Sequence, residues 1–209
     1  MPGPHPRRVG HETLSEVVRK VLLTYWNTAS FFTLYADTNG WDPATAPAPA
    51  RADRPLLDRW ALAELASVTA EVTEALEDFD TQTAGRLLAE FVDDLSNWYV
   101  RRSRRRFWDG DPAALGTLHE VLDGLTRLMA PFTPFVTEEV WARAVAPGLS
   151  DAADSVHLTS WPAVWVSKSS RAAVTSAVTA ASFASAQRSS SGRSVRAGAG
   201  NSTSSKGRW

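Results

Sequence analysis

The chain has 209 residues, of which 44% are hydrophobic and 22% charged, a composition typical of a globular protein, and the lack of cysteine excludes disulfides and thiolate catalysis. The net charge of −1 hides an asymmetry, because residues 1–162 carry 15 Lys and Arg against 23 Asp and Glu, whereas residues 163–209 carry 7 Lys and Arg and no acid. No apolar run reaches the ~18 residues of a membrane helix and no signal peptide opens the chain, so we expect a cytoplasmic protein without membrane contact.

The first expected helix covers residues 13–36, where apolar residues recur near a spacing of 3.6. Thr13 and Glu16 have the spacing of a capping box, which predicts the helix start. The following stretch, through residue 54, is rich in Gly and Pro and is expected to be a loop. The apolar residues expected to face the core are Val17, Val18, Val21, Leu22, Tyr25, Trp26, Ala29, Phe32 and Leu34.

Proline or a capping side chain marks the start of four further helices. Pro55 is suited to a first helical turn, and Asp80 can cap a third helix that runs toward Phe107. Asp111-Pro112 and Thr133-Pro134 each place a capping residue before proline and open two more helices. Residues 155–162 are expected to form a short extended piece that packs back on the helices. The predicted core positions are Leu56, Trp60, Ala63, Val68, Val72, Leu76, Leu87, Leu88, Phe91, Leu95, Trp98, Tyr99, Leu115, Leu118, Leu122, Leu125, Leu128, Phe135, Val136, Val140 and Trp141.

The sequence therefore predicts an all-α fold, an up-and-down bundle of four to five helices over residues 11–162. Residues 1–10 are expected to be a disordered stub. Residues 163–209 contain 13 serines and no leucine, and we expect them to be disordered because they offer little apolar surface to bury. Two interpretations of this tail remain open: a basic RNA-binding arm, or GC-rich coding DNA read in a shifted frame.

Residues 95–108, LSNWYVRRSRRRFW, carry the strongest chemical signal. Five arginines lie within six positions, in an otherwise acidic segment. On a helix, like charges four residues apart repel each other, so partners are expected to offset that cost. A planar guanidinium suits carboxylates, phosphates or aromatic faces. The five are Arg101, Arg102, Arg104, Arg105 and Arg106.

The partners of these arginines stay open at this point. Any one of them can pair with acids on neighbouring helices, such as Asp109 or Asp111, but for the whole cluster at least one or two phosphate contacts are favoured. Trp98 lies seven residues after Phe91, on the same helical face, so we interpret it as a core residue.

The sequence shows no catalytic or metal site. His119 is a lone helical histidine, which we interpret as a surface or boundary residue. The adjacent acids in Glu138-Glu139 and Asp93-Asp94 do not face each other on a helix and make poor acid/base pairs. Neither of the Gly-rich phosphate-loop patterns, G-x-G-x-x-G and G-x-x-x-x-G-K, occurs.

Three runs together carry a resemblance to a known family. VVRKVLLTYWNTASFFTLYA, LSNWYVRRSRRRFW and RLMAPFTPFVTEEVW resemble the anticodon-binding helical domain of class I isoleucyl-tRNA synthetases, in the family's order. The resemblance covers roughly residues 7–162. APFTPFVTEEVW is shared with valyl- and leucyl-type relatives, whereas the other two runs are more particular to the isoleucyl type.

The resemblance implies binding of the anticodon stem-loop of an isoleucine-accepting tRNA. The expected tRNA contacts are Arg101, Arg102, Arg104, Arg105 and Arg106, with Trp98 and Tyr99 added. The parent reaction is ATP-dependent isoleucyl-tRNA aminoacylation, with ATP and Mg²⁺. The HIGH and KMSKS signatures of the parent are not found, so we expect this chain to use no cofactor and to be catalytically inactive by itself.

Other interpretations of the function stay open. The chain can be a non-binding helical remnant, an RNA-binding module acting in trans, or the domain of a valyl- or leucyl-type relative. A monomer is expected, and association with a separately encoded catalytic part is an open alternative.

Overall fold

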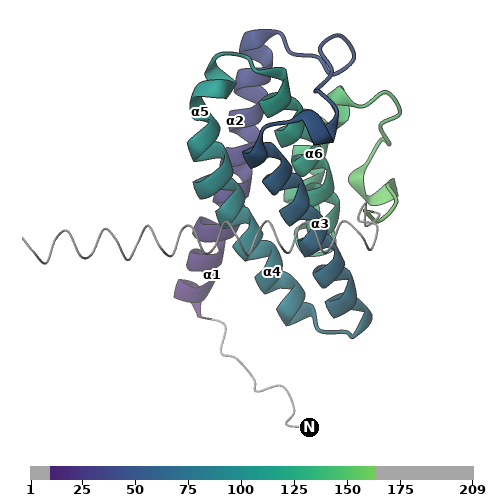
Figure 1. Cartoon of the computed structure of the whole chain (residues 1–209). Helices are drawn as coiled ribbons and strands as arrows, with labels where there is room; N and C mark the ends of the chain where they lie inside the picture. Colours follow the sequence, from purple (N-terminus) through teal and green to yellow (C-terminus); the bar gives the residue numbers. More distant parts are fainter. Residues whose placement is uncertain (1–9, 163–209) are drawn as a thin grey trace, which may run out of the picture. The chain divides into compact units, whose positions relative to one another are not determined.

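The computed structural model describes residues 10–162, and these form five helical rods without a strand (Figure 1). The all-α prediction is confirmed for this part of the chain. The expected N-terminal stub (1–10, apart from Gly10) and the serine-rich tail (163–209) lie outside the described residues. Within the described part, no helix is long and apolar enough to cross a membrane.

The first rod runs from residue 11 to residue 39. It consists of α1 (His11–Val17), a π-helical turn (Val18–Leu22) and α2 (Leu23–Asn39). The rod starts two residues before the predicted cap, with Gly10 at the N-cap and no capping side chain. Gly40 ends it at φ 59°, a left-handed conformation that glycine adopts without strain.

The predicted inward face of this rod is correct in its middle but wrong at its start and at Leu34, which is 60% exposed. Tyr25, Ala29 and Phe32 are buried, whereas Val17 and Val18 are about half exposed. In the first two turns, the apolar spacing therefore does not lead to burial.

The remaining rods begin where the sequence indicates. Pro55 is the N-cap of α3 (Leu56–Glu77), and Asp80 caps α4 (Thr81–Asp94) by accepting a 3.0 Å hydrogen bond from the Thr83 amide. A π-helical turn (Leu95–Val100) joins α4 to α5 (Arg101–Trp108). Within α3, Val68 and Val72 are buried, but Leu56 is exposed and the inward face includes Asp58.

Proline opens the last two rods. Asp111 caps α6 (Pro112–Met129) through a 2.8 Å hydrogen bond from the Ala113 amide. Thr133 precedes α7 (Pro134–Val140) but makes no capping bond, because its hydroxyl donates to the Met129 carbonyl instead. The π-helical turn Trp141–Val145 continues α7.

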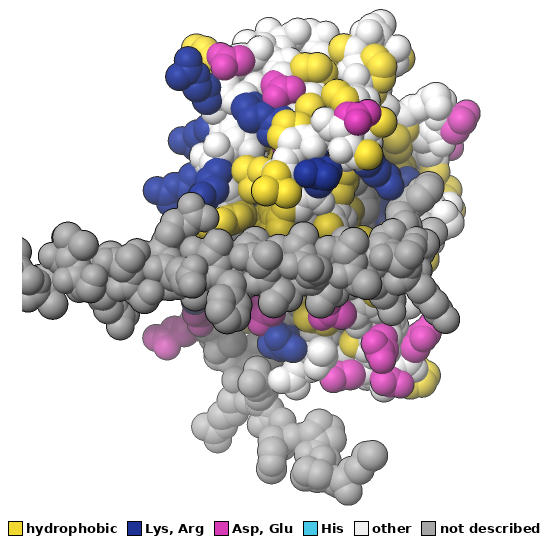
Figure 2. All heavy atoms as spheres, viewed as in Figure 1, with side chains coloured by type: hydrophobic (Ala, Val, Ile, Leu, Met, Phe, Trp, Pro, Cys, Tyr) yellow, Lys and Arg dark blue, Asp and Glu magenta, His cyan; other side chains and the backbone are white. Residues whose placement is uncertain are grey.

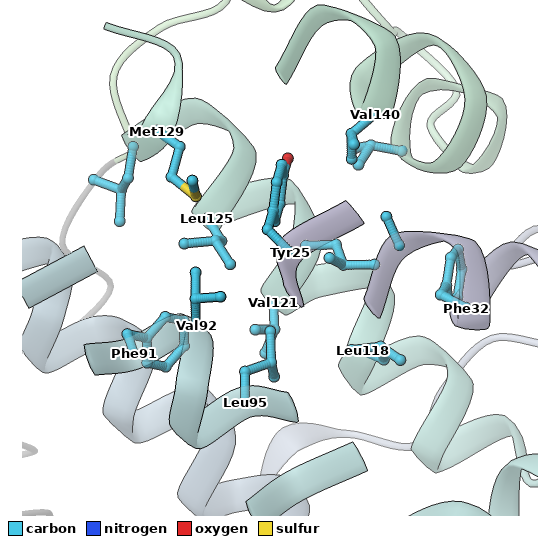
Figure 3. Close-up of a cluster of buried hydrophobic side chains, with 14 of the residues drawn as sticks. Tyr25, Phe32, Phe91, Val92, Leu95, Leu118, Val121, Leu125, Met129 and Val140 are labelled. Carbon is cyan, nitrogen blue, oxygen red and sulfur yellow. The ribbon is translucent and has the colours of Figure 1, made fainter. Parts of the chain in front are cut away.

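Helix α6 lies at the centre of the fold. Its five predicted leucines are fully buried, and fourteen of its eighteen residues are buried in all. Figure 3 shows Leu118, Val121 and Leu125 of α6 among side chains from α2, α4 and α7. Helices α2, α3, α4, α5 and α7 all contact α6. The other helices are therefore positioned by packing against it.

The loop before α3 is fixed to α6 by a buried guanidinium. Arg54 donates to the Pro49 carbonyl (2.9 Å), to the Thr117 hydroxyl (3.0 Å) and to the Glu120 carboxylate (2.5 Å). Because the buried guanidinium bonds both to the loop and to α6, it holds the Gly- and Pro-rich loop against that helix.

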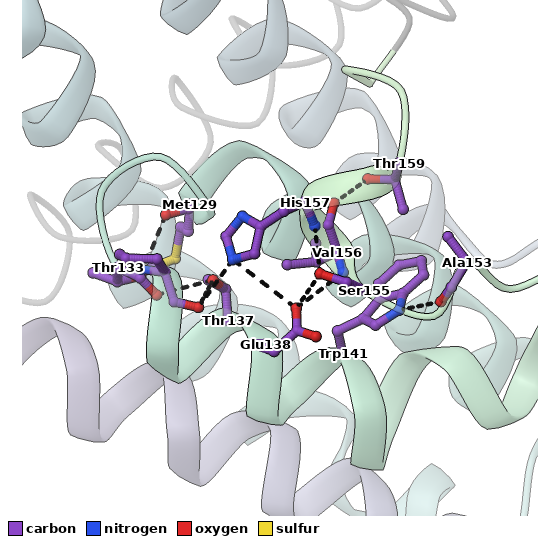
Figure 4. Close-up of polar contacts among 11 residues, drawn as sticks. Met129, Thr133, Thr137, Glu138, Trp141, Ala153, Ser155, Val156, His157 and Thr159 are labelled. Carbon is purple, nitrogen blue, oxygen red and sulfur yellow. Dashed lines mark hydrogen bonds and ion pairs between the residues drawn. The ribbon is translucent and has the colours of Figure 1, made fainter.

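The last described segment packs back on α7, as expected, but as a 3₁₀ turn (Val156–Leu158) rather than an extended piece. Glu138 of α7 accepts hydrogen bonds from the Ser155 hydroxyl and the Val156 amide, and the Trp141 indole donates to the Ala153 carbonyl (Figure 4). These side chain to backbone bonds favour a tight turn over an extended strand.

Candidate nucleic-acid interface

The arginine-rich helix α5 is a continuation of α4, and the π-helical turn between them decides which side chains face outward. A π-helix has one more residue per turn than an α-helix, and each extra residue rotates the later part of the helix by about 100°. Up to the first residue of that turn, Leu88, Val92 and Leu95 are buried at regular α-helical spacing, and Tyr99, seven residues after Val92, lies on the same face. Beyond it, Ser103 and Phe107 are buried, one residue later than an unbroken α-helical register would place them.

The two neighbouring aromatic residues Trp98 and Tyr99 differ in exposure. Trp98, interpreted as core from its spacing to Phe91, is 38% exposed, so that interpretation was wrong. Tyr99, predicted as a tRNA contact, takes the inward position and is fully buried. Its hydroxyl donates to Asp58 (3.0 Å) and to the Ala114 carbonyl (3.3 Å). Tyr99 therefore presents no ring face to a ligand in this conformation.

Arg106 is the one arginine of the cluster that is engaged inside the fold. Its two terminal nitrogens donate to both carboxylate oxygens of Asp58 at 2.6 and 2.7 Å, and Nε donates to Asp111 at 2.7 Å. The Asp58 side chain is 0% exposed. Arg106 thus connects α5 to the start of α3 and to the cap of α6.

The ionisation states of Arg106 and Tyr99 follow from their contacts. Hydrogen bonds to Asp58 raise the pKa of Arg106 above its usual range, which keeps the guanidinium charged. Burial, together with the Asp58 carboxylate, raises the pKa of Tyr99, so its hydroxyl stays protonated and donates. The role of Arg106 seen here is to position α5.

The other four arginines lie on the outer face of α5. Arg101, Arg102, Arg104 and Arg105 are all exposed, and the Arg105 side chain reaches 93%. Figure 2 shows dark blue side chains gathered along the edge where Figure 1 places α5. The interface thus combines four exposed cations on one helix of eight residues.

Few acids offset this charge. Arg105 Nε lies 3.7 Å from Asp109, an exposed pair that contributes little binding energy. The Arg102 guanidinium lies 3.6 Å from the centre of the Trp98 ring, and that of Arg104 lies 6.0 Å from the Phe31 ring. Arg101 has no ion pair with any residue between 10 and 162. This surface is therefore suited to an anionic partner.

Trp108 was not among the residues predicted to contact tRNA, although the structure exposes it beside these arginines. Trp108, the last residue of α5, is 72% exposed, and its ring lies 6.4 Å from that of Tyr35 on α2. Trp108 ends the run LSNWYVRRSRRRFW, and it lies on the side of the helix opposite to the buried face. Tyr35 comes from 73 residues earlier in the chain, so no local pattern could have paired them.

The histidine and the glutamates considered as candidate site residues make contacts within the fold. His119, interpreted as a surface or boundary residue, is instead buried between Phe32 and Trp41, with Nε2 2.9 Å from the Val145 carbonyl. Glu139 pairs with Arg143, whereas its neighbour Glu138 holds the turn after α7. Between residues 10 and 162, no group of three or more His, Asp or Glu could hold a metal ion.

Comparison with known proteins agrees with this architecture. Residues 58–195 match the family described as the anticodon-binding domain of tRNA ligase. That match extends past Pro162 into residues that the structure does not describe. The chain therefore belongs to the family of anticodon-binding domains of tRNA ligases.

Within the family, the sequence is of the isoleucine–tRNA ligase type. Isoleucine–tRNA ligase of Streptomyces avermitilis is 67% identical over 156 residues, which cover 75% of this chain and 15% of that protein. The enzymes of Streptomyces coelicolor and Thermus thermophilus are 65% and 45% identical, with the same coverage. The chain thus spans about 15% of the length of these relatives. They favour the isoleucyl type over the valyl- or leucyl-type alternative.

Proposed function

We propose that this chain binds the anticodon stem-loop of a tRNA through the exposed arginines of α5. The observation that carries the proposal is the set of four exposed guanidinium groups, to which, among residues 10–162, only the carboxylate of Asp109 is paired. Phosphate oxygens accept from a guanidinium in the same bidentate manner as a carboxylate. Contacts to phosphates fix the position of an RNA stem without reading its bases.

The residues behind the arginines support this role by holding α5 in place. The bonds from Arg106 and Tyr99 to Asp58 fix the helix against α3, so its outer face is a rigid platform. Trp98 lies under the Arg102 guanidinium and orients it. Because these groups are ordered before binding, less side-chain entropy is lost when RNA is bound.

The identity of the tRNA and the chemistry of the whole enzyme extend this proposal. The relatives are isoleucine–tRNA ligases, so we expect an isoleucine-accepting tRNA as the partner. This chain would supply tRNA binding in the cytoplasm, as a monomer or beside a separate catalytic part, while ATP and Mg²⁺ act elsewhere in the enzyme. The purified chain is expected to show no ATP–pyrophosphate exchange.

A salt series tests the binding. Four phosphate contacts predict that log K falls with log salt at a slope of about −3. Replacing Arg101, Arg102, Arg104 and Arg105 together by Gln should remove most of the binding and flatten the slope. Arg86→Gln is a matched control, since Arg86 is an exposed arginine on α4 outside the cluster.

Each outcome separates one alternative. A folded wild-type chain that does not bind tRNA at low salt would be a helical scaffold, and the proposal would be wrong. Equal affinity for isoleucine, valine and leucine tRNAs would mean that this chain binds the tRNA stem without distinguishing one tRNA from another. If the fourfold variant still binds tRNA, the binding surface lies outside α5.

A further inference from the structure

Trp108 is one of three aromatic side chains between residues 10 and 162 that are more than 70% exposed, together with Phe79 and Phe135. It ends α5 with 72% of its surface exposed, directly after the arginine run. Exposing an indole to water forgoes the stabilisation that its burial would give. The ring nevertheless has a defined neighbour, since Tyr35 lies 6.4 Å away at an interplanar angle of 61°.

A row of aromatic rings connects this exposed indole to the core. The ring centres of Tyr35 and Phe31 lie 4.6 Å apart. The Phe31 ring meets the fully buried Phe107 ring edge-on, with 5.2 Å between the ring centres. Asn39 adds a bond from α2 to the Phe107 carbonyl at 3.2 Å. The indole therefore lies on a supported surface rather than on a free side chain.

Positive charge lies on the same helix within one turn of Trp108. Arg104 lies over the Phe31 ring and Arg105 is 93% exposed. A cation beside an open aromatic face is the combination that binds single-stranded nucleic acid, where phosphates meet the cations and bases stack on the ring. Bases inside a duplex cannot use this ring, because they are already paired and stacked on both faces.

We propose that Trp108, supported by Tyr35, is a stacking platform for one unpaired RNA base, with Arg104 and Arg105 at its flanking phosphates. This inference rests on the proposed function and adds to it a contact with the single-stranded loop. The arginines alone would hold any stem, whereas the platform requires a base that is free to leave the stack.

The test compares two RNAs on the full 209-residue chain. One is the anticodon stem-loop of an isoleucine tRNA, and the other is the same stem as a blunt duplex without the loop. Trp108→Ala should weaken stem-loop binding about 5- to 150-fold, the equivalent of about 1–3 kcal/mol for one stacked base. Duplex binding should stay within twofold, and Trp108→Phe should recover part of the loss.

Phe79→Ala is the matched control for loss of an exposed aromatic ring. Phe79 is 92% exposed and precedes the other end of the same helical rod, roughly 40 Å from Trp108 at 1.5 Å per residue. Its replacement should change neither affinity. Thermal unfolding should confirm that all variants fold, since neither ring is part of the core.

The failures of the two proposals are distinguishable. If the fourfold arginine variant loses binding but Trp108→Ala binds the stem-loop normally, the platform is wrong and the arginine interface stands. If Trp108→Ala weakens both RNAs equally, Trp108 supports the helix rather than a base. If wild-type protein binds neither RNA, both proposals are wrong, and the exposed indole belongs to a protein contact.

Discussion

The two ends of the helical rod formed by α4 and α5 both present an exposed aromatic ring, in opposite electrostatic surroundings. Trp108 at the α5 end has arginines beside it and Tyr35 behind it. Phe79, just before α4, stands between Asp78 and Asp80, and none of the ring contacts found between residues 10 and 162 involves it. An exposed ring alone therefore does not define a site. Cations and a supporting neighbour distinguish the first end from the second.

The α5 end depends on one buried polar contact, and breaking it gives the largest expected effect. Arg106→Ala leaves the Asp58 carboxylate buried with only the Tyr99 hydroxyl as a side-chain donor, so we expect the free energy of unfolding to fall by about 3–5 kcal/mol. Urea unfolding measures this change. Arg105→Ala, on the exposed face, should stay within about 0.5 kcal/mol.

A conservative variant keeps this test informative if the alanine variant does not fold. Arg106→Lys retains a charge but not the bidentate geometry, and it should cost less than Arg106→Ala. A loss below about 1 kcal/mol in both variants would mean that Asp58 is satisfied without Arg106, and that α5 is positioned by other contacts.

The same rod shows which parts of the structure could be predicted. The start of α4 at Asp80 and the fully buried leucines of α6 follow from local signals, because a cap needs only the next three residues and α6 is buried on nearly every side. The interpretation of Trp98 as a core residue was wrong because the spacing was taken from Phe91 alone, whereas Val92 is buried as well and places Tyr99, seven residues later, inside.

Long-range partners account for the remaining differences. Asp58 and Arg106 lie 48 residues apart, and only the assembled helices show that they pair. His119 is buried because Trp41 and Phe32 close over it, and neither lies within the same helix. Of the seven residues predicted to contact tRNA, the structure leaves the four outer arginines and Trp98 accessible. Their binding of RNA remains a prediction.

The opposite end of the rod carries backbone strain that glycine would relieve. Phe79 has φ 58°, and it occupies the position after α3 where the Asp80 amide bonds the Ala75 carbonyl at 2.7 Å. Glycine is the usual residue in this motif, because a side chain raises the energy of a left-handed residue by about 1–2 kcal/mol. Phe79→Gly should therefore stabilise the fold, by about 0.5–1 kcal/mol after the greater freedom of the unfolded chain is counted.

The midpoint of urea unfolding should rise for Phe79→Gly without a change in slope. Trp108→Gly is the matched comparison and should destabilise, since Trp108 is helical and glycine is unfavourable in a helix. A destabilised Phe79→Gly variant would show that the exposed ring makes contacts in solution, and the distinction between the two ends would weaken.

The smallest expected effect concerns the acidic side of the rod, where Glu64 of α3 is partly buried. Burial raises the pKa of the Glu64 carboxyl, and the charges of Asp94 and Glu71 raise it further. The folded protein then binds this proton more tightly than the unfolded chain, so the Glu64 contribution to stability improves as the pH falls from neutral through the folded-state pKa. Glu64→Gln should therefore be more stable than wild type at pH 7, by less than about 1 kcal/mol because the group is partly solvated and screened. Urea unfolding of both proteins from pH 7 to pH 4 should show the difference shrinking as Glu64 becomes protonated, and a difference that stays constant would assign it to packing rather than to charge.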